Sequence, residues 1–419
     1  MKILCISNLY PPEVLGGYEI LCARVVASFM ARGHEVAVLT TAPKGLPAAT
    51  APALGPATQA PILVPTATAQ ALGPAGEKLF RTLRLYLPFG EPASLARASR
   101  QAVEGPNSRA TRKALRDFKP DIVFVWSQLR LGLAAAREAE AEGFPTVYTM
   151  NDDHVLGFKP GSREGIKGLL RSFIEDIVYP ASTWTGLRLD PVVSISETVR
   201  SRLASEAPRF ASSKIAMQGV PLELFPPKAD IGAAHRPFRV LYAGQLHRYK
   251  GVHTLVEAVA LAGKADFALT VAGAGDPAYE AQLKARAGEL GLDARFLGRV
   301  AADTMGELYR EADALAFTSV WDEPFGLTHL EAMASGTPVA SVGHGGPGEF
   351  LVDDVNALIF GKEDNAGLAG CLRRFSDDES LRRRIALAGR DTVVREFSIE
   401  RYADRLENIL IATIAEARP

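Results

Sequence analysis

The sequence predicts an α/β protein made of two domains, each with a parallel sheet covered by helices. The chain has 419 residues, about the length of two ordinary domains. Hydrophobic residues make up 47% of it and charged residues 23%, a composition typical of folded soluble proteins. Along both halves, short apolar runs of strand length alternate with helix-like segments, and parallel α/β sheets produce this alternation.

The amino-terminal residues begin the first domain with a β-α-β pattern. Residues 2–7 form a candidate strand, 18–32 a helix after a Pro/Gly-rich loop, and 35–40 a second strand. An Ala/Pro/Gly-rich segment follows at 42–76, where only the run PILVP suggests a strand. The alternation resumes with PDIVFVW and ends with PVVSISETVRSRLA, so we expect the first domain to cover 1–222.

A second alternating series follows a polar linker at 226–237 and runs from FRVLYAG through ALAFTSV. We therefore expect a second α/β domain of similar kind over 223–395. The remaining residues, 396–419, are amphipathic and too few for a domain, which indicates a terminal helix.

The segment WDEPFGLTHLEAMASGTPVA places two carboxylates around the start of a helix. Glu323 lies in a Gly/Pro turn after a buried strand, and Glu331 lies about one and a half turns inside the helix that the apolar spacing predicts. The first turn of a helix leaves backbone N–H groups without partners and attracts phosphate. Carboxylates beside such a site are suited to accept hydrogen bonds from hydroxyls of the same ligand, such as a ribose and a sugar.

Composition also limits where the protein acts. The longest apolar runs are far shorter than the ~20 residues that cross a bilayer, and the first residues lack a signal-peptide pattern, so we expect a cytoplasmic protein. Residues 1–222 contain 25 Lys and Arg against 19 Asp and Glu. This excess fits an anionic acceptor, a peripheral membrane contact or simply a solvated surface. The cysteines lack CxxC spacing and are expected to be buried small hydrophobes: Cys5, Cys22 and Cys371.

Two further patterns argue against nicotinamide cofactors and metals. Gly273 and Gly275 in VAGAGDP follow a strand, but the third glycine of a dinucleotide fingerprint is absent. The acidic pair Asp353 and Asp354 falls in a polar turn, and the sequence places no D-x-D pair after a strand. We therefore expect neither NAD binding nor a metal site.

Several segments together resemble glycosyltransferase family 4, the retaining enzymes of the GT-B fold. EPFGLTHLEAMASGTPV resembles the E-x7-E signature of that family, and LYAGQLHRYKG resembles its G-R-L-x3-K-G loop. NLYPPEVLGGYE, VSISETVRSRL and IAMQGVPLELF resemble the Gly-Gly loop, the end of the first domain and the linker, in the family's order. The resemblance implies two Rossmann-like domains with a cleft between them.

The resemblance also implies an activity and its partners. A sugar would pass from a nucleotide-diphospho-sugar, bound by the second domain as a co-substrate, to a sugar, a lipid-linked or a small-molecule acceptor on the first domain. Neither a further cofactor nor a nucleic acid is implied, and the role is carbohydrate biosynthesis. The terminal helix, 396–419, would cross back to the first domain.

Residues of the second domain take specific roles if the resemblance holds. Glu331 would hold the ribose, Glu323 the hydroxyls of the donor sugar, and Lys250 would neutralise the diphosphate as the glycosidic bond breaks. Arg299 and Val300 fall where the family packs the base, although Arg299 also suits a plain surface position. Backbone N–H groups would face the phosphates or the sugar from Phe325, Gly326 and Leu327.

This chain departs from the family pattern at two of the implied positions. Gln245 stands where the family usually has arginine, and Arg248 three residues later is a candidate to supply the missing charge. Asn151 stands where the family has histidine, and its amide can still bond to a sugar hydroxyl. Gly16 and Gly17 match the Gly-Gly loop, where backbone would approach the phosphate.

Two alternatives stay open. A nucleotide-sugar epimerase of the same fold would consume the donor without an acceptor product. A non-catalytic subunit that binds sugar nucleotides would bind the donor without turning it over, and the substitutions at Gln245 and Asn151 make this alternative credible.

Overall fold

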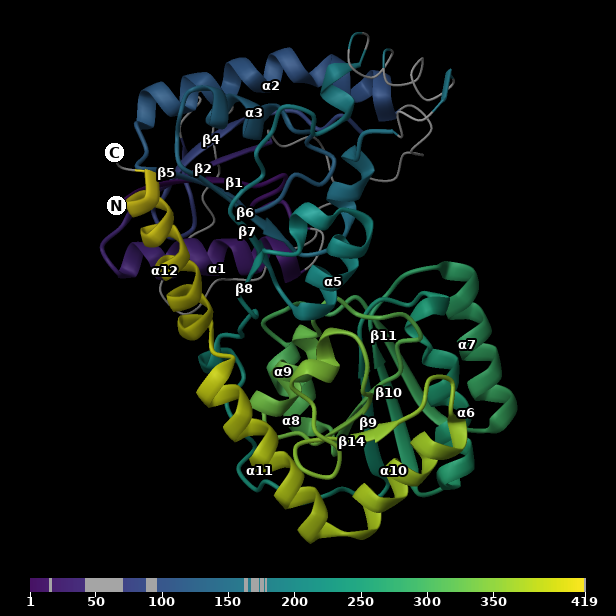
Figure 1. The fold of residues 1–419 in the computed structure, drawn as a ribbon. Helices are drawn as coiled ribbons and strands as arrows, with labels where there is room; N and C mark the ends of the chain where they lie inside the picture. Colours follow the sequence, from purple (N-terminus) through teal and green to yellow (C-terminus); the bar gives the residue numbers. More distant parts are fainter. Residues whose placement is uncertain are drawn as a thin grey trace. The chain divides into compact units, whose positions relative to one another are not determined.

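The structure is a computed structural model that describes residues 1–14, 17–41, 71–87, 96–161, 165–166, 173, 177 and 179–417. The chain divides into two compact units (Figure 1), which are described separately. Unit 1 combines Met1–Ala216 with Ala403–Pro419, and unit 2 is Met217–Tyr402.

Unit 1 is built on an eight-stranded sheet with the order β3-β4-β2-β1-β5-β6-β7-β8. Its neighbouring strands pair in parallel, except that β3 is antiparallel to β4. The strands are β1 (Lys2–Ile6), β2 (Glu35–Thr41), β3 (Ala71–Leu72), β4 (Lys78–Leu83), β5 (Ile122–Val125), β6 (Thr146–Met150), β7 (Val192–Ser194) and β8 (Lys214–Ile215).

Helices cover both faces of this sheet, with α1 on one face and α2 and α3 on the other (Figure 1). The end of α1 is tied to the carboxyl-terminal helix, because Arg32 Nη1 lies 2.6 Å from both Asp404 Oδ1 and Glu407 Oε2. The α-helices of this unit include α1 (Gly17–Ala31), α2 (Ala96–Phe118), α3 (Ala134–Ala141), α5 (Glu197–Glu206) and most of α12 (Ile399–Ala417).

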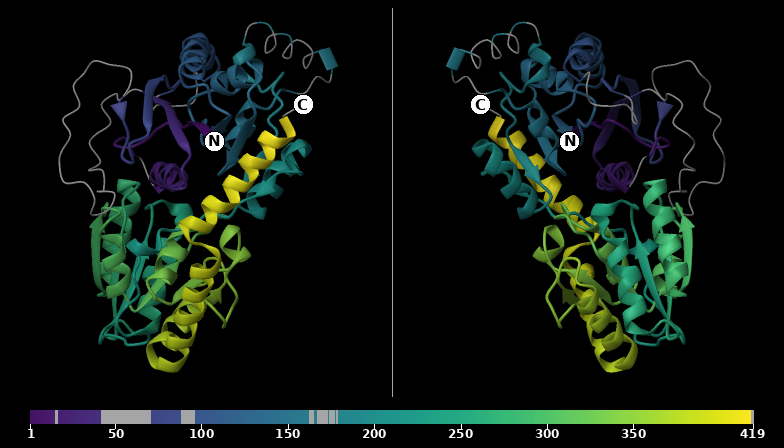
Figure 2. Two further views of the ribbon diagram at one scale, coloured as in Figure 1. Left: turned by 90° about the vertical axis from the view of Figure 1, so that its left-hand side faces the viewer. Right: turned by 90° about the vertical axis from the view of Figure 1, so that its right-hand side faces the viewer.

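Unit 2 has a six-stranded, wholly parallel sheet with the order β11-β10-β9-β12-β13-β14. The views in Figures 1 and 2 show its helices on both sides of the sheet. The strands are β9 (Phe238–Ala243), β10 (Phe267–Ala272), β11 (Asp293–Gly298), β12 (Ala314–Phe317), β13 (Val339–Val342) and β14 (Leu358–Phe360); the α-helices are α6 (Val252–Gly263), α7 (Pro277–Leu290), α8 (Met305–Glu311), α9 (Leu327–Ala334), α10 (Asn365–Asp377) and α11 (Glu379–Glu396).

The central strands are apolar along their whole length because both of their faces are buried. All four residues of β5, and all four of β12, are buried. Helices on both faces of a parallel sheet remove the alternation of polar and apolar residues that a one-sided sheet shows. The predicted α/β class, with two Rossmann-like domains, is therefore confirmed.

The first predicted elements agree with the structure to within one residue. The sequence predicted a strand at 2–7, a helix at 18–32 and a strand at 35–40. The structure has β1 at Lys2–Ile6, α1 at Gly17–Ala31 and β2 at Glu35–Thr41. The PILVP run lies outside the described residues. Among the helices that the structure describes, we find none with the length and apolar character that a membrane span needs.

Candidate functional site

The order of strands in unit 2 marks one place for a ligand. The chain forms β9, β10 and β11 toward one edge of the sheet and then β12, β13 and β14 toward the other, so the direction reverses between β9 and β12. Open parallel sheets bind ligands at the carboxyl ends of the strands that flank such a reversal. The loops after β9 and β12 carry Lys250 and Glu323, respectively.

The loop after β9 holds Lys250 against the end of β12. A 3₁₀ turn spans Arg248–Lys250, and Gly251 follows with a φ of 67° at the start of α6. A side chain at Gly251 would collide with the carbonyl oxygen of Thr318. The Thr318 hydroxyl donates to the Lys250 carbonyl at 2.9 Å. Glycine is therefore required here, and it fixes the backbone of the lysine.

Lys250 and Glu323 form a largely buried ion pair. Lys250 Nζ lies 2.5 Å from Glu323 Oε1, and the two side chains are 16% and 11% exposed. Ser319 Oγ donates to the same carboxylate oxygen at 2.7 Å. The fold thus places a cation and an anion in direct contact at the point where the strand order reverses.

Two glycines that the sequence analysis did not select shape the backbone of the Glu323 turn. The Gly346 N–H donates to the Glu323 carbonyl at 2.8 Å. A Cβ at Gly345 would lie 2.8 Å from the Glu323 nitrogen, and one at Gly346 would collide with the Pro324 carbonyl. In the sequence, only the Gly-Gly pair in GHGGPGEF could have indicated this role, but glycine pairs are common in ordinary turns.

Helix α9 begins directly after this turn. Gly326, with a φ of 110°, occupies the N-cap and has no side chain to bond the first N–H groups of the helix. Beneath it, His329 is fully buried between the Gly326 carbonyl, 3.2 Å from Nδ1, and Ser341 Oγ, 2.8 Å from Nε2. Burial lowers the pKa of His329 to about 3, so the ring is neutral at physiological pH.

Glu331 lies on α9 and meets a buried tyrosine. Tyr309 Oη donates to Glu331 Oε2 at 2.8 Å. Burial, and then the nearby Glu331 carboxylate, raise the pKa of Tyr309 well above its usual value, so the phenol stays protonated and remains a donor. The Tyr309 hydroxyl therefore fixes the position of one carboxylate oxygen of Glu331.

Gln245 and Arg248 are exposed on the loop after β9. Tyr249 Oη donates to Gln245 Oε1 at 3.2 Å, and the Tyr242 hydroxyl donates to the Gln245 carbonyl at 2.9 Å. Within the described part of the chain, Arg248 makes no ion pair. The structure brings Lys250 and Glu323 together but does not place Arg248 against them.

Arg299 and Val300 follow β11, at the edge of the sheet. The loops after β9, β10 and β11 are joined by backbone, because the Leu246 N–H donates to the Ala274 carbonyl at 3.2 Å and the Gly273 N–H donates to the Gly298 carbonyl at 2.8 Å. Side chains at Gly273 and Gly275 would collide with the carbonyls of Gly244 and Leu246. The glycines of VAGAGDP are therefore explained by close backbone packing.

The remaining predicted residues belong to unit 1. Asn151 follows β6 and is buried, with its amide donating to Tyr18 Oη. Tyr18 in turn donates to the Trp126 carbonyl at 2.9 Å. Gly17 is the first residue of α1, and a Cβ there would meet no atom within 4 Å. Gly16 lies outside the described residues.

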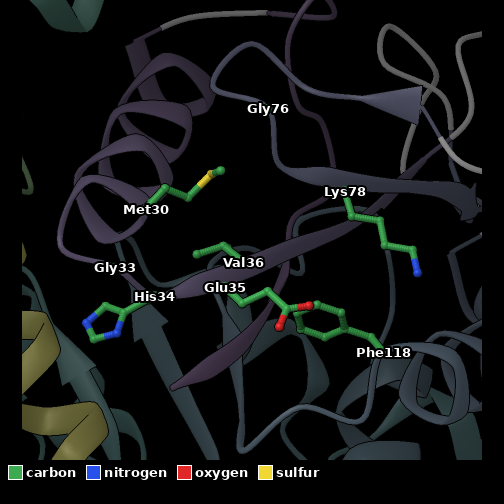
Figure 3. A pocket seen from close by; sticks show the side chains of 8 residues that line it. All are labelled: Met30, Gly33, His34, Glu35, Val36, Gly76, Lys78 and Phe118. Atoms are coloured by element: carbon green, nitrogen blue, oxygen red, sulfur yellow. The ribbon is translucent and has the colours of Figure 1, made fainter.

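A hollow of about 450 Å³ lies at the opposite, amino-terminal edge of the unit 1 sheet (Figure 3). Two of its polar side chains already have partners, since His34 Nε2 lies 2.6 Å from Glu407 Oε1 and Glu35 Oε1 lies 3.4 Å from Lys2 Nζ. Open parallel sheets bind ligands at the carboxyl ends of their strands. We therefore do not assign ligand binding to this hollow. Its lining is Met30, Gly33, His34, Glu35, Val36, Gly76, Lys78 and Phe118.

Comparison with family models decides the classification. The model described as Glycosyltransferase Family 4 matches residues 15–217, and the one described as Glycosyl transferases group 1 matches residues 227–392. The two regions together cover most of the chain and meet near the boundary between the units. The chain belongs to glycosyltransferase family 4. The resemblance drawn from the E-x7-E segment and its companions is confirmed.

Relatives of this glycosyltransferase carry different names. A glycogen synthase from Mycobacterium tuberculosis (strain ATCC 25618 / H37Rv) is 25% identical over 98% of this chain and 95% of its own. A lipopolysaccharide core biosynthesis glycosyltransferase, LpsE, from Rhizobium meliloti is 34% identical over 41% of this chain and 49% of its own.

Solved structures with a similar fold cover nearly all of this chain. Sucrose-phosphate synthase from Thermosynechococcus elongatus has a TM-score of 0.74 at 20% identity, covering 99% of each chain. Anabaena HepE, solved in complex with UDP and glucose, has a TM-score of 0.68 at 18% identity, covering 98% of this chain and 100% of its own. These neighbours confirm the GT-B fold.

Proposed function

We propose that this glycosyltransferase moves a sugar from a nucleotide-diphospho-sugar to an acceptor, with retention of the anomeric configuration and without a metal ion. The observation that carries the proposal is the Lys250–Glu323 pair beside the first turn of α9. A cation near a helix amino terminus suits a diphosphate. A neighbouring carboxylate suits the hydroxyls of the sugar attached to that diphosphate.

Glu331 would accept hydrogen bonds from the ribose hydroxyls. Its Oε2 accepts one bond from Tyr309, and a carboxylate oxygen can accept more than one hydrogen bond. Phe325, Gly326 and Leu327 would direct backbone N–H groups at the phosphates or the sugar. Arg299 and Val300 are proposed to lie beside the base.

The reaction would proceed at the anomeric carbon of the donor sugar. The bond from this carbon to the diphosphate oxygen breaks, and the acceptor oxygen bonds to the same face through an oxocarbenium-like transition state. The proton of the acceptor hydroxyl passes to the departing diphosphate. Lys250 stabilises the negative charge that the leaving group gains, a task that a divalent ion performs in metal-dependent transferases.

Support for the donor class comes from relatives. HepE has been solved in complex with UDP and with UDP-glucose, which makes UDP-sugars the first donors to test. We place the acceptor on unit 1 and propose that Asn151 bonds to a sugar hydroxyl. A cytoplasmic location, with peripheral membrane contact through the basic first half, completes the proposal.

A thermal-shift screen with UDP, UDP-glucose and other nucleotide-sugars tests the donor site, because a ligand that binds only the folded state raises the midpoint. Product analysis by NMR then reads the anomer formed. Donor consumption without an acceptor product would favour an epimerase. Donor binding without transfer or hydrolysis would favour a non-catalytic subunit, and the absence of any shift would reject the proposal.

A further inference from the structure

Unit 1 has its own reversal of strand order. The chain forms β1, β2 and β4 toward one edge and β5, β6, β7 and β8 toward the other, so β1 and β5 are the neighbouring strands at which the direction reverses. Lys250 and Glu323 follow the equivalent two strands of unit 2. The carboxyl ends of β1 and β5 are therefore the place in unit 1 where a ligand is expected.

Two buried side-chain amides lie at these strand ends, and their oxygens accept no hydrogen bond within the described part of the chain. Asn8 comes two residues after β1 and Gln128 three residues after β5, and they are only 1% and 4% exposed. In the part of the chain that the structure describes, Asn8 Oδ1 and Gln128 Oε1 have no hydrogen-bond partner. Buried polar atoms are nearly always paired, so an external partner is the simplest explanation for both.

The backbone around the two amides is fixed. Thr41 Oγ1 donates to the Asn8 carbonyl at 2.7 Å, and the Leu131 N–H donates to the Gln128 carbonyl at 3.0 Å. The N–H groups of Trp126 and Ser127 both donate to the Ile6 carbonyl, at 2.8 and 3.2 Å, which joins the two loops. The amides thus lie on a rigid frame rather than on freely moving loops.

The chemistry of this edge differs from that of the donor site. The polar side chains that leave β1 and β5 are uncharged and buried, whereas β9 and β12 lead to a cation and an anion. A hydroxyl both donates and accepts, so it pairs with an amide in either orientation. These uncharged side chains are Ser7, Asn8, Ser127 and Gln128.

We propose that Asn8 and Gln128 bind the hydroxyls of a neutral, unphosphorylated sugar moiety of the acceptor. This inference rests on the proposed function and names the acceptor class for it. The two amide oxygens accept hydrogen bonds from sugar hydroxyls, while the diphosphate of the donor stays with Lys250 in unit 2.

The test uses the full chain with UDP present and measures the binding of D-glucose, maltose and myo-inositol by saturation-transfer NMR. Asn8→Leu and Gln128→Met keep the side-chain size but remove the amide. Both should weaken binding of the sugar that the wild type prefers by about tenfold or more, since a buried donor in the ligand loses its acceptor. Affinity for UDP and the thermal midpoint should not fall, because neither oxygen has a protein partner to lose.

Asn107→Leu is the matched control. The Asn107 amide is fully bonded, accepting from the Arg84 N–H at 2.8 Å and donating to the carbonyls of Arg84 and Leu131 at 2.9 and 3.2 Å. This variant should lower the thermal midpoint, as expected for a structural amide.

Three results would overturn the inference. The first is that none of the three neutral probes binds at millimolar concentration. The second is that both variants leave sugar binding unchanged. The third is that Asn8→Leu and Gln128→Met lose as much stability as Asn107→Leu. If the wild type binds UDP but not the sugars, only this inference fails. If it binds no nucleotide, the proposed function fails as well.

Discussion

Lys250 Nζ and Glu323 Oε1 lie 2.5 Å apart, in an ion pair that is mostly shielded from water. Both residues are proposed to contact the donor, yet they neutralise each other before the donor arrives. The pair therefore holds the ammonium at a defined position against the turn that precedes α9. Groups that are positioned in advance stabilise a developing charge without further reorganisation.

Lys250→Met should lower kcat/KM by about a hundredfold, because a charged hydrogen bond to the leaving group is worth up to ~3 kcal/mol. It should also lower the thermal midpoint, since Glu323 is left buried without its cation. The double variant Lys250→Met/Glu323→Gln should recover stability but not activity. Lys284→Met removes an exposed lysine paired with Glu280 and should leave both quantities nearly unchanged.

Glu331→Ala should weaken nucleotide binding, whereas Glu323→Ala should chiefly lower turnover, because one is assigned to the ribose and the other to the reacting sugar. Each loss should be about ten- to hundredfold. Tyr309→Phe removes the bond that orients Glu331 and should give a smaller change in the same direction as Glu331→Ala. Calorimetric titration with UDP and steady-state kinetics separate the two effects, and wild-type values in both glutamate variants would refute the assignment.

The elements that the sequence predicted best are those with strong local signals. The β1-α1-β2 unit and the turn before α9 combine apolar periodicity with Gly and Pro at the breaks. Helix α2, Ala96–Phe118, was not predicted; Gly105 and Pro106 lie inside it, and both residue types are unfavourable within helices. Its position depends on packing against the sheet, which periodicity alone does not reveal.

The candidate site was predictable only in part. The E-x7-E spacing identified the two glutamates, but nothing local indicated that Lys250, 73 positions earlier, would contact Glu323. That contact follows from strand order, since β9 and β12 are neighbours although two strands separate them in sequence. Asn8 and Gln128 lacked any signal, because an unpaired buried amide is recognisable only once its surroundings are known.

The substitution of Gln245 offers a direct test of the diphosphate clamp. If Arg248 supplies the missing charge, Arg248→Ala should lower both kcat and kcat/KM, because a cation near the leaving group stabilises the transition state more than the bound donor. Gln245→Arg should preserve or raise activity. Since Arg248 is exposed, a silent Arg248→Ala beside an inactive Lys250→Met would leave Lys250 as the single cation of the clamp.

Full activity should survive EDTA, because Lys250 and the backbone N–H groups at the start of α9 are proposed to neutralise the diphosphate. The assay compares initial rates in EDTA with rates after adding back magnesium or manganese. Rates should agree within about twofold. Activity that disappears in EDTA and returns only with a divalent ion would show that Lys250 does not perform this task alone.

His329 makes stability depend on pH. Burial lowers its pKa to about 3 in the folded chain, against about 6.5 when it is exposed in the unfolded chain. Between these values the unfolded state binds a proton that the folded state does not. The stabilising contribution is therefore fully present above about pH 6.5 and is lost progressively as the pH falls from 6.5 toward 3.

From pH 7 to pH 5, this one group should reduce the free energy of unfolding by about 2 kcal/mol, by proton linkage. His329→Asn cannot take up the proton, so its urea-unfolding free energy should fall by about 2 kcal/mol less than that of the wild type over the same range.

At pH 7 the variant should itself be less stable, because the hydrogen bonds to Gly326 and Ser341 are altered. A small cavity also forms beside Phe317, whose ring centroid lies 4.1 Å from that of His329. The comparison of the two pH slopes separates these effects, since the packing loss is the same at both pH values whereas the proton term is not. Equal slopes in the two proteins would mean that the folded chain protonates His329 at an ordinary pH and that the ring under the first turn of α9 is not held neutral.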